Sequence, residues 1–108
     1  MQKKVPKDTK ILRWTKHVVK KMAYYGISEG LIRRVLRRPI RKQEGVAPDT
    51  ISVMQPTGYV HTKEVWVMYQ VKKGFTTIIT AWRYPGKSPV HKIPIPDDIR
   101  EELWGLTS

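Results

Sequence analysis

The sequence has no cysteine, so neither a disulfide framework nor a zinc site built from thiolates is available to it. It also has no apolar run near the roughly 20 residues that a membrane-spanning helix needs. Its first ten residues, MQKKVPKDTK, lack the apolar stretch of a secretory signal. These absences favour a cytoplasmic protein that does not insert into a membrane.

Acidic residues are scarce: nine Asp and Glu stand against 21 Lys and Arg, which gives a net charge of +12. The excess is concentrated in the first part of the chain and favours a polyanionic partner, either nucleic acid or an acidic protein. The alternative is a basic protein with no such partner. At 108 residues, we expect a loose basic arm over residues 1–10 and a single domain over residues 11–108.

Local signals predict two consecutive helices near the N-terminus. Thr15 is a suitable N-cap for a helix over residues 16–25, and Gly26 can take the left-handed conformation that ends it. Ser28 is a suitable N-cap for the next helix, which Pro39 prevents from continuing.

The second of these helices is amphipathic and has a basic polar face. On a 3.6-residue period, its apolar side chains share one arc: Leu31, Ile32, Val35 and Leu36. Arginines fill the opposite arc: Arg33, Arg34, Arg37 and Arg38. Because guanidinium groups bind phosphates and carboxylates through paired hydrogen bonds, this stripe is predicted to be a binding face.

After Pro39 the pattern changes to the two-residue alternation of β-strands. Strands are expected over residues 40–46, 51–55, 64–72 and 75–84, with a short one over 11–14. The proline-rich residues 85–96 are expected to be irregular, and residues 97–104 to form a helix. These elements predict an α+β fold in which two N-terminal helices pack on one face of a four-stranded antiparallel sheet, followed by a short C-terminal helix.

Lys73 and Gly74 fit a two-residue hairpin turn, in a register that sets Glu64 opposite Arg83. One face of the hairpin is then largely apolar: Val65, Val67, Tyr69, Val71, Ile78 and Trp82. The other face is mixed: Trp66, Met68, Gln70, Lys72, Phe75, Thr77, Ile79 and Arg83. We expect the helices to cover the apolar face and the mixed face to stay partly open.

His17 is the first candidate for chemistry, because it lies early in the first helix beside several lysines. An imidazole with a pKa of about 6.5 is a usable general acid or base, and the positive charge around it would stabilise a developing anion. The alternative is an exposed histidine with no functional role.

Arg83 ends the last long strand and is followed by Tyr84, with His91 further along the chain. An arginine, a phenol and an imidazole together can bind a phosphate and assist attack by the 2′-hydroxyl on the adjacent phosphorus, which cleaves RNA. The alternative is that Arg83 only pairs with Glu64. The three histidines lack metal-ligand spacing, so neither a metal nor a cofactor is expected.

The string W-x-K-H-x-x-K-K-M-x-x-x-G-I-S-x-x-x-I-x-x-V-L-x-x-P, from Trp14 to Pro39, resembles the DUF4258 family, and the likeness extends through IITAWRYP at the last strand. That family is grouped with the RelE/ParE-like toxins, some of which cut mRNA on the ribosome while others poison gyrase. The resemblance implies an α+β fold whose sheet binds RNA on the face opposite the helices, and a functional role for His17. Where the family shows an arginine this chain has Lys21, which keeps the charge but not the bidentate fork.

The leading hypothesis is a RelE-like toxin-type protein that acts on mRNA, free or ribosome-bound, as a metal-independent endoribonuclease or by binding alone. Its catalytic candidates are His17, Arg83, Tyr84 and His91. Its RNA-binding candidates are Lys20, Lys21, Arg33, Arg34, Arg37, Arg38, Lys72 and Lys73. The alternative is a non-catalytic basic module that binds nucleic acid or an acidic protein such as an antitoxin, or that acts on gyrase.

Overall fold

The computed structural model describes residues 12–44, 47–58 and 63–107. These residues form β1 (Leu12–Trp14), α1 (Lys16–Tyr25), α2 (Glu29–Arg37), β2 (Arg41–Glu44), β3 (Thr50–Thr57), β4 (Lys63–Lys72), β5 (Phe75–Tyr84) and α3 (Asp97–Thr107). The predicted α+β class is therefore confirmed. The arm predicted over residues 1–10 and the end of the strand predicted over 40–46 lie outside the described residues. No helix in the described part of the chain is long and apolar enough to cross a membrane.

The described strands form one five-stranded sheet in the order β1-β5-β4-β3-β2. The pairs from β2 to β5 are antiparallel, as predicted, but β1 runs parallel to β5 and makes the sheet mixed. The prediction of a four-stranded antiparallel sheet is therefore incomplete. The short β1 joins the sheet through a distant partner, and the amide of Thr15 extends the pairing by donating to the carbonyl of Ile78 at 3.2 Å.

The two N-terminal helices begin and end where the local signals predict. The hydroxyl of Thr15 accepts from the amide of Val18 at 3.0 Å, and Gly26 closes α1 with a φ of 66°. Ser28 caps α2 by accepting from the amide of Leu31 at 3.1 Å. These caps satisfy amides that a helix end otherwise leaves unpaired.

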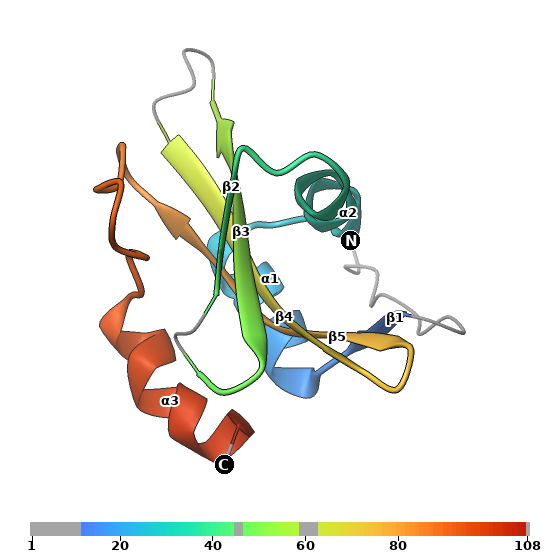
Figure 1. The fold of residues 1–108 in the computed structure, drawn as a ribbon. Coiled ribbons are helices and arrows are strands. Elements are labelled where there is room, and N and C mark those ends of the chain that lie inside the picture. The colour runs from blue at the N-terminus through green and yellow to red at the C-terminus, as the bar shows by residue number, and fades with distance from the viewer. Residues whose placement is uncertain (1–11, 45–46, 59–62, 108) are drawn as a thin grey trace.

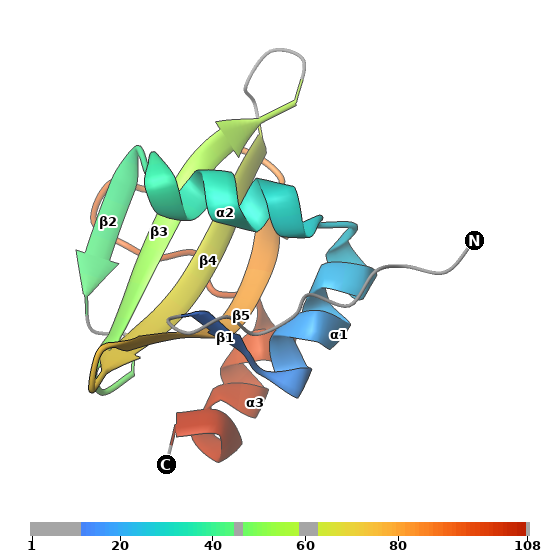
Figure 2. The ribbon, with the colours of Figure 1, turned by 90° about the vertical axis from the view of Figure 1, so that its right-hand side faces the viewer.

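Layers of structure cover both faces of the sheet (Figures 1 and 2). α1 and α2 pack on one face, over a core that includes Val18, Ile32 and Val67. On the other face α3 and residues 85–96 cover a second core of Met54, Trp66, Met68, Ile79, Trp82, Ile99 and Leu103. The expectation that this face stays partly open is therefore wrong, because the apolar side of α3 is buried against it.

The hairpin between β4 and β5 turns at Lys73 and Gly74, as predicted. The register then shifts by one residue near Met68, because β5 carries an extra residue, Ile79, that has no partner on β4. The hydroxyl of Thr15 donates to the carbonyl of Ile79 at 2.9 Å, which satisfies an acceptor of this bulge.

This bulge moves the end of β5 to faces opposite those predicted. Trp82 lies on the α3 side, stacked on Trp66 with ring centroids 6.0 Å apart and planes inclined by 3°. Arg83 consequently lies on the helix side. Glu64 pairs with Tyr84 across the strands, so the predicted opposition of Glu64 and Arg83 is wrong.

Candidate functional site

His17 of α1 is largely enclosed by β5 and α3, and both of its ring nitrogens have partners. Its Nδ1 lies 2.8 Å from Oε2 of Glu102, and its Nε2 lies 2.9 Å from Oγ1 of Thr80. Burial lowers the pKa of His17 below its ordinary value, and the nearby Glu102 offsets only part of this effect. A neutral ring that donates from Nδ1 to the carboxylate accepts at Nε2 from the threonine hydroxyl. With 9% of the side chain exposed, His17 is not the exposed histidine of the alternative reading.

The sequence of groups Thr80, His17 and Glu102 resembles the hydroxyl, imidazole and carboxylate of a nucleophilic relay. Thr80, however, is completely buried, so no substrate can reach its hydroxyl. The contacts among these three residues therefore hold β5, α1 and α3 together.

The same side of α1 carries two further contacts to α3. Nζ of Lys21 lies 2.7 Å from Oδ2 of Asp98 and 3.1 Å from Oε1 of Glu102. Burial acts to lower the pKa of Lys21, but the hydrogen bonds to these carboxylates outweigh it and raise the pKa above its ordinary value. The hydroxyl of Tyr25 donates to Asp98, and burial together with that charge raises the pKa of Tyr25 to about 12. Lys21 is therefore engaged by α3, whereas Lys20 is exposed.

Arg83 caps the C-terminal end of α1. Its Nε donates to the carbonyl of Tyr25 at 2.8 Å and its Nη2 donates to the carbonyl of Gly26 at 2.9 Å. Glu64 is buried elsewhere, accepting from the indole of Trp66 at 3.0 Å and from the amide of Ser88 at 3.2 Å. Arg83 is thus neither a partner of Glu64 nor a wholly free cation.

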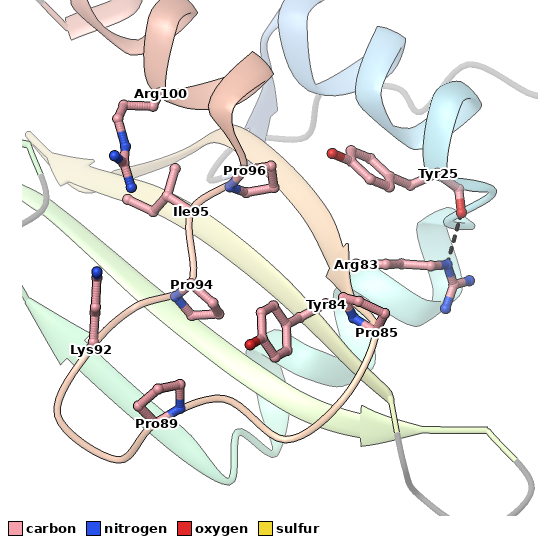
Figure 3. A pocket seen from close by; sticks show the side chains of 10 residues that line it. All are labelled: Tyr25, Arg83, Tyr84, Pro85, Pro89, Lys92, Pro94, Ile95, Pro96 and Arg100. Atoms are coloured by element: carbon pink, nitrogen blue, oxygen red, sulfur yellow. Dashed lines mark hydrogen bonds between the residues drawn. The ribbon is translucent and has the colours of Figure 1, made fainter.

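Tyr84 and Arg83 line a hollow at the end of β5, which Figure 3 shows between α1, α3 and residues 85–96. His91 is exposed on that segment but does not belong to the lining of the hollow. His17 lies away from the hollow, in contact with Thr80 and Glu102. The four predicted catalytic side chains therefore lie at three separate places.

The arginine stripe of α2 lies at the surface. Arg33 is held by Glu29 at 2.8 Å, and its guanidinium carbon lies 5.7 Å from the ring centroid of Trp14. The remaining arginines are exposed: Arg34, Arg37 and Arg38. Within the described part of the chain, no ion pair or hydrogen bond engages the side chains of these three.

The other predicted RNA-binding lysines lie at the hairpin between β4 and β5. Lys72 lies 3.8 Å from Asp49, and both side chains are exposed. Lys73 is exposed in the turn itself, with a φ of 52°. Both lysines are open to solvent, and one has a loosely placed acidic neighbour.

Arg41 is a residue whose role the sequence did not indicate. Its Nη1 donates to the hydroxyl of Ser88 at 2.6 Å, its Nη2 donates to the carbonyl of Val90 at 3.2 Å, and its guanidinium carbon lies 4.9 Å from the ring centroid of Trp66. Nothing near Arg41 in the sequence points to these partners. Lys92 and Arg100, which also line the hollow, were missed as well, although they flank a run of prolines.

Among the described residues, no three His, Asp or Glu side chains gather where they could hold a metal ion. Comparisons of the chain with models of protein families, with curated proteins and with solved structures gave no match. The family resemblance stated from the sequence therefore stays a prediction.

Proposed function

We propose that this protein binds RNA through a surface formed by Arg34 and Arg37 of α2, its C-cap Arg38 and Lys42 of β2, named here the α2 surface, and that it holds mRNA without cutting it. This is the binding part of the cytoplasmic, RelE-like role that the family resemblance implies. Lys42 pairs with Val53, a member of the helix-side core, so it projects from the same side of the sheet as α2.

The separation of charge across the sheet carries this proposal. Asp98 and Glu102 belong to α3, on the opposite face of the sheet from α2, and they pair with Lys21 and His17 of α1 (Figure 1). Asp98 and Glu102 therefore engage a lysine and the histidine of α1, whereas Arg34, Arg37 and Arg38 have no acidic partner among the described residues. A surface of one sign with exposed guanidiniums is a ready binding site for a phosphate backbone.

The geometry of α2 suits consecutive phosphates. Arg37 lies three positions after Arg34 on α2, so their Cβ atoms are neighbours about 5–6 Å apart on one helix face, and Arg38 is the C-cap, whose amide donates to the carbonyl of Arg34. Each guanidinium can donate two parallel hydrogen bonds to one phosphate. Such contacts bind a backbone without selecting its sequence.

Binding is favoured over cleavage because the described structure does not bring the candidate catalytic groups together. His17 uses both ring nitrogens inside the protein, and Arg83 uses two of its nitrogens on the end of α1. General acid–base catalysis requires a group within hydrogen-bond reach of the substrate.

The test measures fluorescence anisotropy of a labelled single-stranded RNA over a series of KCl concentrations. We expect Arg34→Glu/Arg37→Glu/Arg38→Glu to weaken binding at least about tenfold and to reduce the salt slope by about 2, since each lost phosphate contact contributes about 0.7. The matched control reverses three other exposed cations, Lys16, Lys63 and Lys87, and is expected to bind much more like the wild type.

If both triple variants lose RNA binding equally, net charge alone explains the loss, and the assignment of RNA binding to the α2 surface is overturned. Cleavage of RNA by the purified wild-type protein, with ribosomes or in EDTA, would overturn the claim that RNA is held intact. If the α2 surface instead binds an acidic protein, RNA binding is absent and the alternative reading stands.

A further inference from the structure

The hollow at the end of β5 has a volume of about 450 Å³, within the roughly 300–1,000 Å³ of small-molecule sites. Its lining consists of Tyr25, Arg83, Tyr84, Pro85, Pro89, Lys92, Pro94, Ile95, Pro96 and Arg100. Three of these ten residues are cationic, two are phenols, four are prolines and none is acidic. The hollow thus combines flat apolar walls with positive charge.

The wall formed by residues 85–96 is fixed in place by the sheet. Arg41 donates to the hydroxyl of Ser88 and to the carbonyls of Val90 and Lys92, the last at 3.4 Å. Gln43 adds a hydrogen bond to the carbonyl of Val90 at 3.1 Å. Because prolines also restrict the backbone, the hollow is preformed, and a ligand need not order this segment in order to bind.

The positive charge of the hollow is not neutralised from within. Asp98 of α3 is occupied by Lys21 and by the hydroxyl of Tyr25, and no carboxylate lines the hollow. The side chains of Lys92 and Arg100 make no hydrogen bond or ion pair with any residue that the structure describes. An anionic group is therefore the natural ligand at that end of the hollow.

We propose that this hollow binds a nucleoside monophosphate, either free or as an unpaired nucleotide of RNA. Figure 3 shows Lys92 and Arg100 at one end, Arg83 at the other and Tyr84 between them. The phosphate is held by Lys92 and Arg100, and the base lies against Tyr84 and the prolines. Arg83 borders the hollow, but its Nε and Nη2 are occupied by the carbonyls of Tyr25 and Gly26 at the end of α1, so the contacts to the nucleotide are assigned to the other side chains.

The test titrates the full-length protein with AMP, CMP, GMP and UMP by calorimetry, beside adenosine and inorganic phosphate as partial ligands. At least one monophosphate is expected to bind, and each partial ligand at least about tenfold more weakly, because it uses half of the site. Lys92→Gln/Arg100→Gln should weaken the monophosphate about tenfold or more. The matched control, Lys16→Gln/Lys63→Gln, also neutralises two exposed cations and should bind like the wild type.

The proposal is overturned if none of the four monophosphates binds. It is also overturned if Lys92→Gln/Arg100→Gln and its control bind a monophosphate with equal affinity. A second variant, Tyr84→Leu, should weaken the monophosphate while leaving any binding of inorganic phosphate unchanged, and unchanged nucleotide affinity would also count against the site. Displacement of the monophosphate by single-stranded RNA identifies the RNA form of the ligand, and retention identifies the free nucleotide; both support the shared chemistry.

Binding of an RNA nucleotide in the hollow rests on the function proposed above, whereas binding of a free nucleoside monophosphate does not. Arg34→Glu/Arg37→Glu/Arg38→Glu separates the two failures, because it removes the α2 surface and leaves the hollow intact. It should bind monophosphates like the wild type, whatever it does to RNA.

Discussion

Replacing Arg83 with methionine tests whether this residue is a structural cap of α1. Methionine retains an unbranched apolar stem and removes the guanidinium that donates to the carbonyls of Tyr25 and Gly26. A hydrogen bond that involves a charged group contributes about 1.5–3 kcal/mol, but water reaches the exposed Gly26 and replaces part of that. We therefore expect the free energy of unfolding to fall by about 1–2 kcal/mol.

The assay is urea unfolding followed by tryptophan fluorescence and by circular dichroism. The matched control is Arg100→Met, which removes an exposed guanidinium that makes no hydrogen bond to the described residues, and which should change stability by less than about 0.5 kcal/mol. An equal, small effect of the two substitutions would refute the capping role of Arg83. Arg83 would then remain a candidate catalytic residue without a structural role.

Two further predictions concern the contacts of α3 and of residues 85–96. The pKa of His17 is below its ordinary value in the folded chain. As the pH falls through about 6.5, the unfolded chain therefore takes up the proton before the folded chain does, and the free energy of unfolding should decrease. His17→Gln should flatten this dependence in urea titrations between about pH 7.5 and 5.5, and parallel wild-type and variant curves would contradict the role of burial. Arg41→Gln should speed amide hydrogen exchange at Val90 and Lys92 about tenfold and leave exchange in α2 unchanged. The control Lys42→Gln changes the neighbouring exposed residue and should leave exchange at Val90 and Lys92 unchanged. Equal exchange in the two variants would show that Arg41 does not hold residues 85–96 in place.

The helices and the main hairpin were predictable because their signals lie within a few residues of one another. Thr15, Gly26 and Ser28 each act on amides or carbonyls of the adjacent turn. Lys73 and Gly74 likewise set their turn through their own backbone conformation. In each case the determining interaction spans no more than a single turn of the chain.

The register near the end of β5 was not predictable in the same way. The extra residue Ile79 has its carbonyl bound by Thr15, 64 positions away in the chain. No alternation within β5 reveals that contact, and a one-residue shift moves every later side chain to the other face. Trp82 and Arg83 were therefore assigned to the wrong faces, and the supposed pairing of Arg83 with Glu64 followed from the same error.

The candidate site failed to assemble for a related reason. A histidine among lysines in the sequence looks like a cationic reaction centre, but α3 returns to place Glu102 and Asp98 against His17 and Lys21. The pattern of α3 itself offered a hint, since Ile99 and Leu103 are four positions apart and require an apolar partner. That spacing predicts a packed helix without showing which surface it covers.

Net charge alone does not locate a binding face on this protein. The chain carries +12 overall, yet α3 holds four of its nine acidic residues within six positions, Asp97 to Glu102. Because α3 packs on the face away from α2, two of these acids, Asp98 and Glu102, pair with cationic or titratable groups of α1, and none pairs with Arg34, Arg37 or Arg38. The fold therefore decides which cations remain open to solvent: the arginines at the end of the second N-terminal helix remain open, whereas Lys21 of the first is engaged by α3.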